Sequence, residues 1–199
     1  MIIEPLFPTP IGFFELGREL TKKELDFITK QERRPNMGNK TSADFNVLEK
    51  AALKSLRKFI EESIDEYFNA TIAPMNDVKL RITQSWCNYT EPGEYHHKHA
   101  HPNSIISGVF YPQADKDKDK IYFYKEGYQQ IKMPTEKWNP FNSESWWFPV
   151  YSGRLLLFPS NQTHMVETLD HDQTRISLSF NTFPVGKVGH DESLTGLYL

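Results

Sequence analysis

The chain of 199 residues carries a formal net charge of −3 and a sequence pI of about 6.2. This balance gives no long-range attraction to nucleic acid or to an anionic membrane surface, so it argues against a nucleic-acid-binding protein. Hydrophobic residues make up 38% of the chain and aromatic residues 14%, enough for a single folded domain over residues 1–199 with a sizeable core.

The N-terminal third predicts an edge strand and two helices. Residues 2–16 resemble a strand interrupted by three prolines, and their acidic Glu4 and lack of a basic head exclude a signal peptide or a membrane span. Thr21 and Glu24 have capping-box spacing, which predicts a helix over residues 21–33. Apolar residues at helical spacing predict a longer helix from Ser42 or Asp44 to about residue 69. The two helices would form a helical support over about residues 20–70.

The character of the sequence changes after residue 79. Short apolar or alternating runs, separated by turn residues, predict strands at residues 80–89, 104–111, 121–124, 154–158, 165–169 and 175–183. Helices followed by many short strands favour a β-sandwich or barrel braced by helices. The run DKDKDK at residues 115–120 is expected at an exposed hairpin tip.

Cysteine and tryptophan usage add two expectations. Cys87 is the single cysteine, so no intramolecular disulfide can form; we expect a reducing compartment, the cytoplasm, and a buried, unreactive thiol. Residues 131–149 hold three of the four tryptophans together with three prolines. This segment is either a long loop that packs its own rings against the sandwich or a lid or wall over a pocket.

Residues 89–101, YTEPGEYHHKHAH, contain four of the seven histidines. Alternate side chains of an extended strand share a face, so His97, His99 and His101 are predicted to point the same way. Neutral imidazoles that converge on one point are typical transition-metal ligands, although a solvated histidine-rich loop gives the same pattern. His96 and His171 are expected to be exposed to solvent.

A second signal lies at residues 153–181, GRLLLFPSNQTHMVETLDHDQTRISLSFN. Together with the first, it resembles the Fe(II)- and 2-oxoglutarate-dependent dioxygenases, and more narrowly a phage and bacterial branch of 2-oxoglutarate–Fe(II) oxygenases, over residues 80–183. In that family one strand ends in H-x-D, a second histidine follows far along the chain, and an arginine comes shortly after it. His99-Ala-His101, His164 and Arg175 stand at those places.

The resemblance implies a fold, an activity and two cofactors. The fold would be mainly β, a double-stranded β-helix (jelly roll, cupin-like) over about residues 79–183. The enzyme would oxidise a substrate C–H bond, usually by hydroxylation, while 2-oxoglutarate is converted to succinate and CO2. His99, His101 and His164 would hold Fe(II), and Arg175 would bind the far carboxylate of 2-oxoglutarate through paired charge-assisted hydrogen bonds.

Three further residues are candidates for contacts with that carboxylate. Strand periodicity places Ser177 on the same face as Arg175, where its hydroxyl could reach the group. Tyr89 or Tyr111 could donate a phenol hydrogen bond, although each is equally explained as a core aromatic with a satisfied hydroxyl.

The chain departs from the family pattern at the third ligand, where His101 replaces the usual carboxylate. Compared with two histidines and a carboxylate, three neutral imidazoles would leave the iron complex one charge more positive. They would also make zinc or nickel more competitive with iron for the site. Two other ligand sets stay open: His97 with His99 as the pair, or a two-histidine site with His101 holding a water or a ligand from outside. The nearest replacement carboxylates are those of Glu94, Glu167 and Asp170.

Three functions therefore compete on the sequence. The first is an oxygenase acting on a small-molecule or protein substrate. The second is a catalytically silent metal-binding jelly-roll module, which the H-x-H replacement favours. The third is a metal-dependent isomerase or hydrolase, which the dicarboxylate-binding arrangement of Arg175 disfavours. The fold does not choose the substrate.

Overall fold

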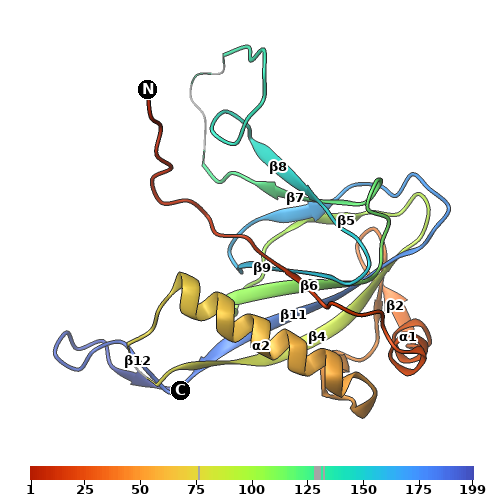
Figure 1. The fold of residues 1–199 in the computed structure, drawn as a ribbon, viewed down its shortest axis with the longest axis horizontal. Helices are drawn as coiled ribbons and strands as arrows, with labels where there is room; N and C mark the ends of the chain where they lie inside the picture. The colour runs from red at the N-terminus through yellow and green to blue at the C-terminus, as the bar shows by residue number, and fades with distance from the viewer. Residues whose placement is uncertain (76, 128–130, 132) are drawn as a thin grey trace.

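The computed structural model describes residues 1–199 except 76, 128–130 and 132. Two antiparallel β-sheets pack face to face, and the helices cover the outer face of the larger sheet (Figure 1). The larger sheet has the order β1 (Gly12–Glu15), β9 (Arg154–Pro159), β6 (Ile106–Gln113), β11 (Arg175–Val185), β4 (Lys79–Thr90), β3 (Lys40–Ser42), β2 (Arg33–Pro35). The smaller sheet has the order β5 (His96–His99), β10 (His164–Val166), β7 (Lys120–Tyr124), β8 (Ser145–Pro149).

Successive strands of the chain alternate between the two sheets. From β4 to β7 every strand lies in the opposite sheet from the one before it, and the same alternation runs from β8 to β11. This winding is the double-stranded β-helix that the sequence predicted. A small third sheet, β12 (Lys187–Val188) with β13 (Leu197–Tyr198), carries the C-terminal tail.

The strand period divides the core into two layers. Odd positions of β9 such as Leu155 and Leu157 join Phe110 and the helices in a cluster outside the larger sheet. Even positions of β9 such as Leu156 and Phe158 lie in the space between the two sheets. Side chains of both sheets therefore line the intersheet space, and polar side chains from the two sheets can meet there.

The first helix, α1 (Lys22–Thr29), begins where the sequence predicted. The amide of Glu24 donates to Thr21 Oγ1 at 3.3 Å, and the Thr21 amide donates back to Glu24 Oε2 at 2.8 Å, which is a complete capping box. The predicted end at residue 33 is wrong, because Arg33 already pairs in β2.

The second helix, α2 (Lys54–Thr71), begins about ten residues later than predicted. The segment before it forms two 3₁₀ turns, η1 (Val47–Glu49) and η2 (Ala51–Leu53), separated by an extended Lys50. Hydrogen bonds to the larger sheet hold this segment: the Cys87 amide donates to Ser42 Oγ, and the Leu48 amide donates to Ser85 Oγ, both at 3.0 Å. These tertiary contacts override the helical period of the sequence.

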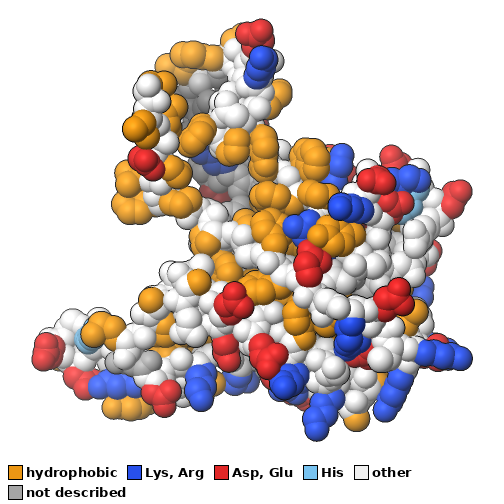
Figure 2. Space-filling view, viewed as in Figure 1, with side chains coloured by type: hydrophobic (Ala, Val, Ile, Leu, Met, Phe, Trp, Pro, Cys, Tyr) orange, Lys and Arg blue, Asp and Glu red, His pale blue; other side chains and the backbone are white. Residues whose placement is uncertain are grey.

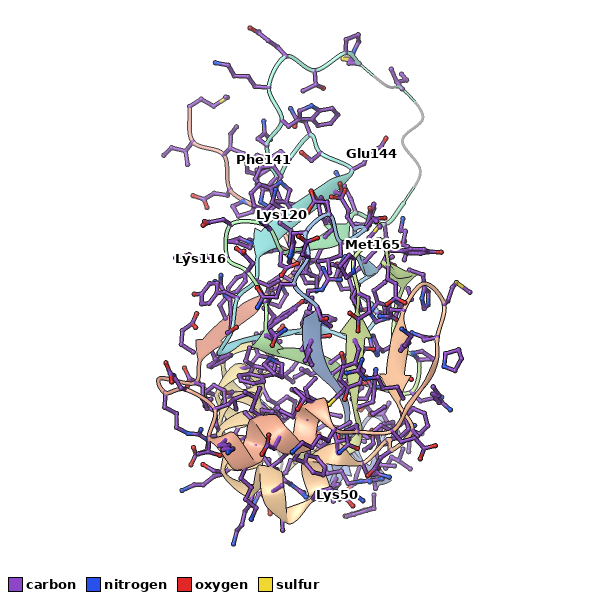
Figure 3. The ribbon with its side chains drawn as sticks, turned by 90° about the vertical axis from the view of Figure 1, so that its right-hand side faces the viewer. Lys50, Lys116, Lys120, Phe141, Glu144 and Met165 are labelled. Atoms are coloured by element: carbon purple, nitrogen blue, oxygen red, sulfur yellow. The ribbon has the colours of Figure 1, made fainter. Side chains whose placement is uncertain are left out.

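Two strands of the smaller sheet, β5 and β8, were not predicted. A projecting arm, residues 125–144, joins β7 to β8. Figure 1 shows this segment leaving the body of the molecule, and Figure 3 places Phe141 and Glu144 on it, above Lys120 and Met165. Figure 2 shows hydrophobic side chains on the projection that the arm and the N-terminal segment form together. Exposed rings there include Trp138 at 65% and Phe141 at 57%.

None of the helices in the described residues is long and apolar enough to cross a bilayer. Cys87 is fully buried, and burial raises the pKa of its thiol to about 12. The predicted burial of this thiol is therefore confirmed, and the high pKa agrees with the predicted lack of reactivity.

Candidate metal centre and its neighbouring pocket

Three imidazoles meet in the intersheet space where β5 ends and β10 begins. One ring nitrogen each of His99, His101 and His164 lies within 4.8 Å of the others. The Nε2 atoms of His101 and His164 are 3.3 Å apart, in parallel rings. Two nitrogens bound at right angles to one ion, at usual metal–nitrogen lengths, would be about 3 Å apart. The spacing therefore fits a shared ion, and the predicted convergence of these three residues is observed.

Backbone carbonyls fix the tautomers of two of these rings. His99 Nδ1 lies 2.7 Å from the carbonyl oxygen of His97, and His164 Nδ1 lies 3.0 Å from that of Gln162. Because a carbonyl only accepts, each Nδ1 carries the proton, and each Nε2 has its lone pair free for a metal. This pairing of an oriented Nδ1 with a free Nε2 is the usual arrangement of metal-binding histidines.

Burial keeps the three imidazoles neutral. Burial, and next the charge of His99, lowers the pKa of His101 to about 4, while hydrogen bonding by Asn181 opposes the shift. Burial also lowers the pKa of His99 and places the pKa of His164 well below its ordinary value. Neutral imidazoles are the form that binds a cation.

The other members of the histidine-rich stretch also lie nearby. His96, His97 and His99 form a second group whose ring nitrogens approach within 4.8 Å of one another. The predicted exposure of His96 is wrong, because its ring is partly buried and stacks on His99 with a centroid distance of 4.7 Å. Of the described residues, only histidines form such groups, so Glu94, Glu167 and Asp170 do not replace the missing carboxylate.

Arg175 enters the same space from the start of β11 and is only 4% exposed. Its Nη1 donates to Asp119 Oδ1 at 3.2 Å, and His171 Nε2 lies 3.4 Å from the same oxygen. Asp119 is 2% exposed, so the prediction of a wholly exposed DKDKDK tip is wrong for this residue. The predicted exposure of His171 is also wrong, since it is 9% exposed. Burial of Arg175 explains the burial of Asp119, because the charge of the arginine needs a buried carboxylate partner, and His171 packs against the same carboxylate.

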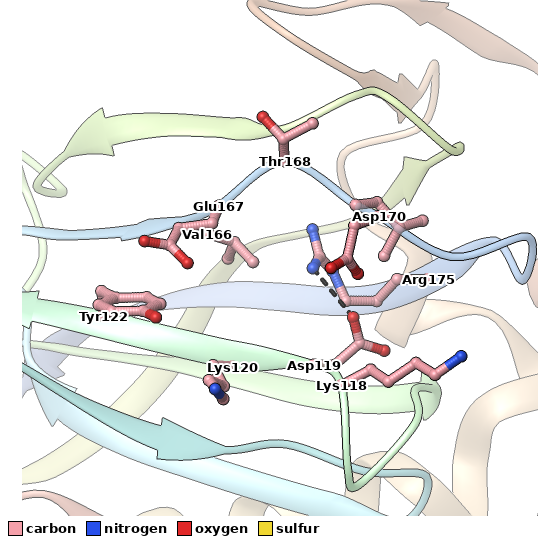
Figure 4. A pocket seen from close by; sticks show the side chains of 10 residues that line it. Lys118, Asp119, Lys120, Tyr122, Val166, Glu167, Thr168, Asp170 and Arg175 are labelled. Atoms are coloured by element: carbon pink, nitrogen blue, oxygen red, sulfur yellow. Dashed lines mark hydrogen bonds and ion pairs between the residues drawn. The ribbon is translucent and has the colours of Figure 1, made fainter.

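The second guanidinium nitrogen, Nη2 of Arg175, is buried and has no hydrogen-bond partner in the described part of the chain. A buried donor without a partner is costly, and it marks a place where an acceptor from outside the chain fits. Beside the guanidinium lies a pocket of about 120 Å³ (Figure 4). It is lined by Lys118, Asp119, Lys120, Tyr122, Val166, Glu167, Thr168, Leu169, Asp170 and Arg175.

The pocket and the histidines are neighbours along β10. Val166 lines the pocket and lies two residues after His164 on β10, opposite His96 in the strand register. The charge of Arg175 contributes to the lowered pKa of His96, after burial and the neighbouring imidazoles. The imidazole cluster and the guanidinium therefore lie near each other, with His96 close to both.

The three remaining predicted contacts divide between the two faces of the larger sheet. Ser177 lies on the same face as Arg175, as predicted, and its Oγ accepts from Asn88 Nδ2 at 3.2 Å. Tyr111 lies in the intersheet cluster, close enough for the charge of Arg175 to act on its pKa. The prediction for Tyr89 is wrong: its hydroxyl donates to the carbonyl oxygen of Ile28 at 2.5 Å, beneath the helices on the opposite face.

The tryptophan-rich segment does not form the wall of the Arg175 pocket, because no residue of 131–149 lines it. The hypothesis of a pocket wall there is not supported for this pocket. Residue 132 lies outside the described residues.

A family model described as "Putative 2OG-Fe(II) oxygenase" matches residues 84–181, about half of the chain, including all four predicted metal- and carboxylate-binding positions. A search of curated protein sequences found no match. The narrower phage and bacterial branch stays a prediction.

Solved structures with the same fold share little sequence. A 2OG-Fe(II) oxygenase family oxidoreductase from Burkholderia pseudomallei is 12% identical, with 79% of this chain and 74% of that chain covered and a TM-score of 0.56. A prolyl-4-hydroxylase from Pseudomonas putida is 11% identical, with 87% and 92% covered and a TM-score of 0.56. HygX from Streptomyces hygroscopicus, with nickel and 2-oxoglutarate bound, is 10% identical, with 87% and 82% covered and a TM-score of 0.55.

Proposed function

Because this chain belongs to the 2-oxoglutarate–Fe(II) oxygenases, a family of oxidoreductases that use Fe(II) and 2-oxoglutarate, we propose that it hydroxylates a C–H bond of a small-molecule or protein substrate. In this reaction dioxygen and 2-oxoglutarate are consumed; one oxygen atom enters the substrate as a hydroxyl group and the other enters succinate, with release of CO2. One observation carries the proposal: three metal-binding imidazoles and a buried arginine with an unpartnered nitrogen face the same intersheet space. The lone buried cysteine supports a cytoplasmic location.

We assign the metal to His99, His101 and His164. Each is neutral, and two of them have the free Nε2 fixed by a carbonyl bond at Nδ1. The bound iron would supply the activation of dioxygen that oxidation of a C–H bond requires. The chain's part is to hold three neutral donors on one side of the ion, so that the other positions stay open for ligands that are not protein.

We assign the far carboxylate of 2-oxoglutarate to Arg175. Asp119 holds one guanidinium nitrogen, which fixes the plane of the group, and the other nitrogen is free to donate to the cofactor. Ser177 and Tyr111 are the neighbouring hydroxyls on that side of the sheet, and either can add a hydrogen bond. A dicarboxylate would thereby satisfy the buried donor that the protein alone leaves without a partner.

A catalytically silent module that binds metal is the competing function, and the replacement of a carboxylate by His101 favours it. Anaerobic addition of Fe(II) and then 2-oxoglutarate to the purified protein separates the two functions. We expect a visible charge-transfer band from the chelated oxoacid, followed by succinate when oxygen is admitted with a substrate. A band that never leads to succinate with any substrate tested would favour the silent module, and tight zinc retention without a band would contradict the proposal.

A further inference from the structure

Strand β5 carries two imidazoles that the proposed reaction does not use, and they cluster with His99. The ring centroids of His96 and His97 are 5.4 Å apart, and each lies 4.7 Å from the centroid of His99. One ring nitrogen of each residue lies within 4.8 Å of the others. All three side chains are partly buried. The cluster shares His99 with the candidate centre but adds two ligands of its own.

A β-bulge brings this cluster together. The register pairs His164 with His99 and Val166 with His96, so β5 uses three residue steps where β10 uses two. In a regular strand His96 and His99 would point to opposite faces. The extra residue turns His96 back toward His99, and bulges of this kind re-aim side chains next to functional sites.

The hydrogen bonds show which nitrogens are available. The proton of His99 Nδ1 is held by the carbonyl of His97, so only Nε2 of His99 can bind an ion. His97 Nδ1 lies 3.3 Å from the carbonyl oxygen of Met37, which leaves its Nε2 free in the same way. The ring of His96 makes no hydrogen bond with any residue that the structure describes, and it contacts the rings of His97 and His99 only through ring–ring packing.

We propose that His96, His97 and His99 form a second metal site, which competes with the His99, His101 and His164 site for the single free nitrogen of His99. The ligand class is a divalent cation that favours imidazole, such as Zn²⁺ or Ni²⁺, for which three histidines and an exogenous ligand are a common coordination sphere. An ion held in the second site removes one donor from the first. The binding claim stands without the proposed function, and only its consequence, inhibition by excess zinc, rests on that function.

The direct test deletes the first site and keeps the second. The variant His101→Gln/His164→Gln, freed of metal and checked by circular dichroism, is titrated with Zn²⁺ against a chromophoric chelator. We expect it to bind one Zn²⁺, and we expect the further change His97→Gln to weaken that binding by roughly 10-fold or more, the range over which even outer-shell partners act. No zinc binding by the folded double variant, or binding unaffected by His97→Gln, would overturn the proposal.

A second measurement needs no substitution. In the wild-type protein, ¹⁵N NMR of the histidine rings during a Zn²⁺ titration beyond one equivalent should show shifts for His96 and His97; shifts confined to the first site would refute the second. Once turnover is measured, His97→Gln should need about ten times more Zn²⁺ for half-inhibition. An absence of turnover would contradict the proposed function and leave the two binding results to decide this inference.

Discussion

Replacement of Arg175 by methionine tests the proposed cofactor contact, because methionine keeps much of the side-chain volume and removes the charge. A charge-assisted hydrogen bond contributes roughly 1.5–3 kcal/mol, and the unpartnered Nη2 is available for at least one bond to a carboxylate. We therefore expect 2-oxoglutarate binding to weaken by about 3 kcal/mol, roughly a 100-fold rise in Kd.

The assay is calorimetric titration of the Ni(II)-loaded protein with 2-oxoglutarate, with Ni(II) as a stand-in that avoids turnover. Metal affinity, measured separately, should change by less than about threefold, because the guanidinium is not among the grouped nitrogens. Arg57→Met is the control: Arg57 pairs with Glu61 on the exposed face of α2 and should leave both affinities unchanged. A parallel loss of metal and 2-oxoglutarate binding in Arg175→Met, or no loss of either, would refute the assignment.

Three further predictions concern the surroundings of the site. Asp119→Asn leaves a buried guanidinium without its carboxylate and should lower the free energy of unfolding in urea by about 3 kcal/mol. Saturating 2-oxoglutarate should restore a part of this loss, and equal losses with and without 2-oxoglutarate would contradict the prediction. Tyr89→Phe should cost about 1 kcal/mol, since the bond to the Ile28 carbonyl is lost, and should leave the Kd for 2-oxoglutarate unchanged. Hydrogen bonding by Arg18 lowers the pKa of Glu24 to about 2, so this carboxylate stabilises the fold above pH 4.5 and the contribution disappears as pH falls toward 2. Glu24→Gln should reduce the change in unfolding free energy between pH 4.5 and pH 2 by about 1–2 kcal/mol, a figure lowered because Arg18 is partly exposed to solvent. If the unfolding free energy of the variant changes with pH as steeply as that of the wild type, another group titrates in this range.

Much of the fold and part of the site were predictable because local periodicity determines them. The alternation of β11 sends Ile176, Leu178 and Phe180 to the helix-covered face and Arg175 and Ser177 to the intersheet face, as the sequence indicates. The convergence of the histidines likewise depends on the extended-chain period that gives His99 and His101 one face, and on β10, whose start the pattern located to within one residue.

The remaining features depend on contacts between distant segments. No local pattern showed that Asp119, at the end of a charged run, would turn inward, because its burial follows from Arg175 more than fifty residues away. The sequence indicated a solvent-exposed His96, and the bulge against β10 instead turns its ring toward His99. The position of Tyr89 follows from the strand pairing, which the sequence did not reveal. Arg175 pairs with Thr90, so these two side chains share the intersheet face, and the next residue, Tyr89, points to the helix side.

The central claim is that one metal ion binds where the imidazoles of His99, His101 and His164 meet, with 2-oxoglutarate extending from it to Arg175. Anomalous diffraction from crystals of the protein loaded with Ni(II) and 2-oxoglutarate measures this most directly. The account predicts a single strong peak within about 2.0–2.2 Å of the three Nε2 atoms and a cofactor carboxylate in contact with the guanidinium. A peak elsewhere, or a cofactor pointing away from Arg175, would contradict it.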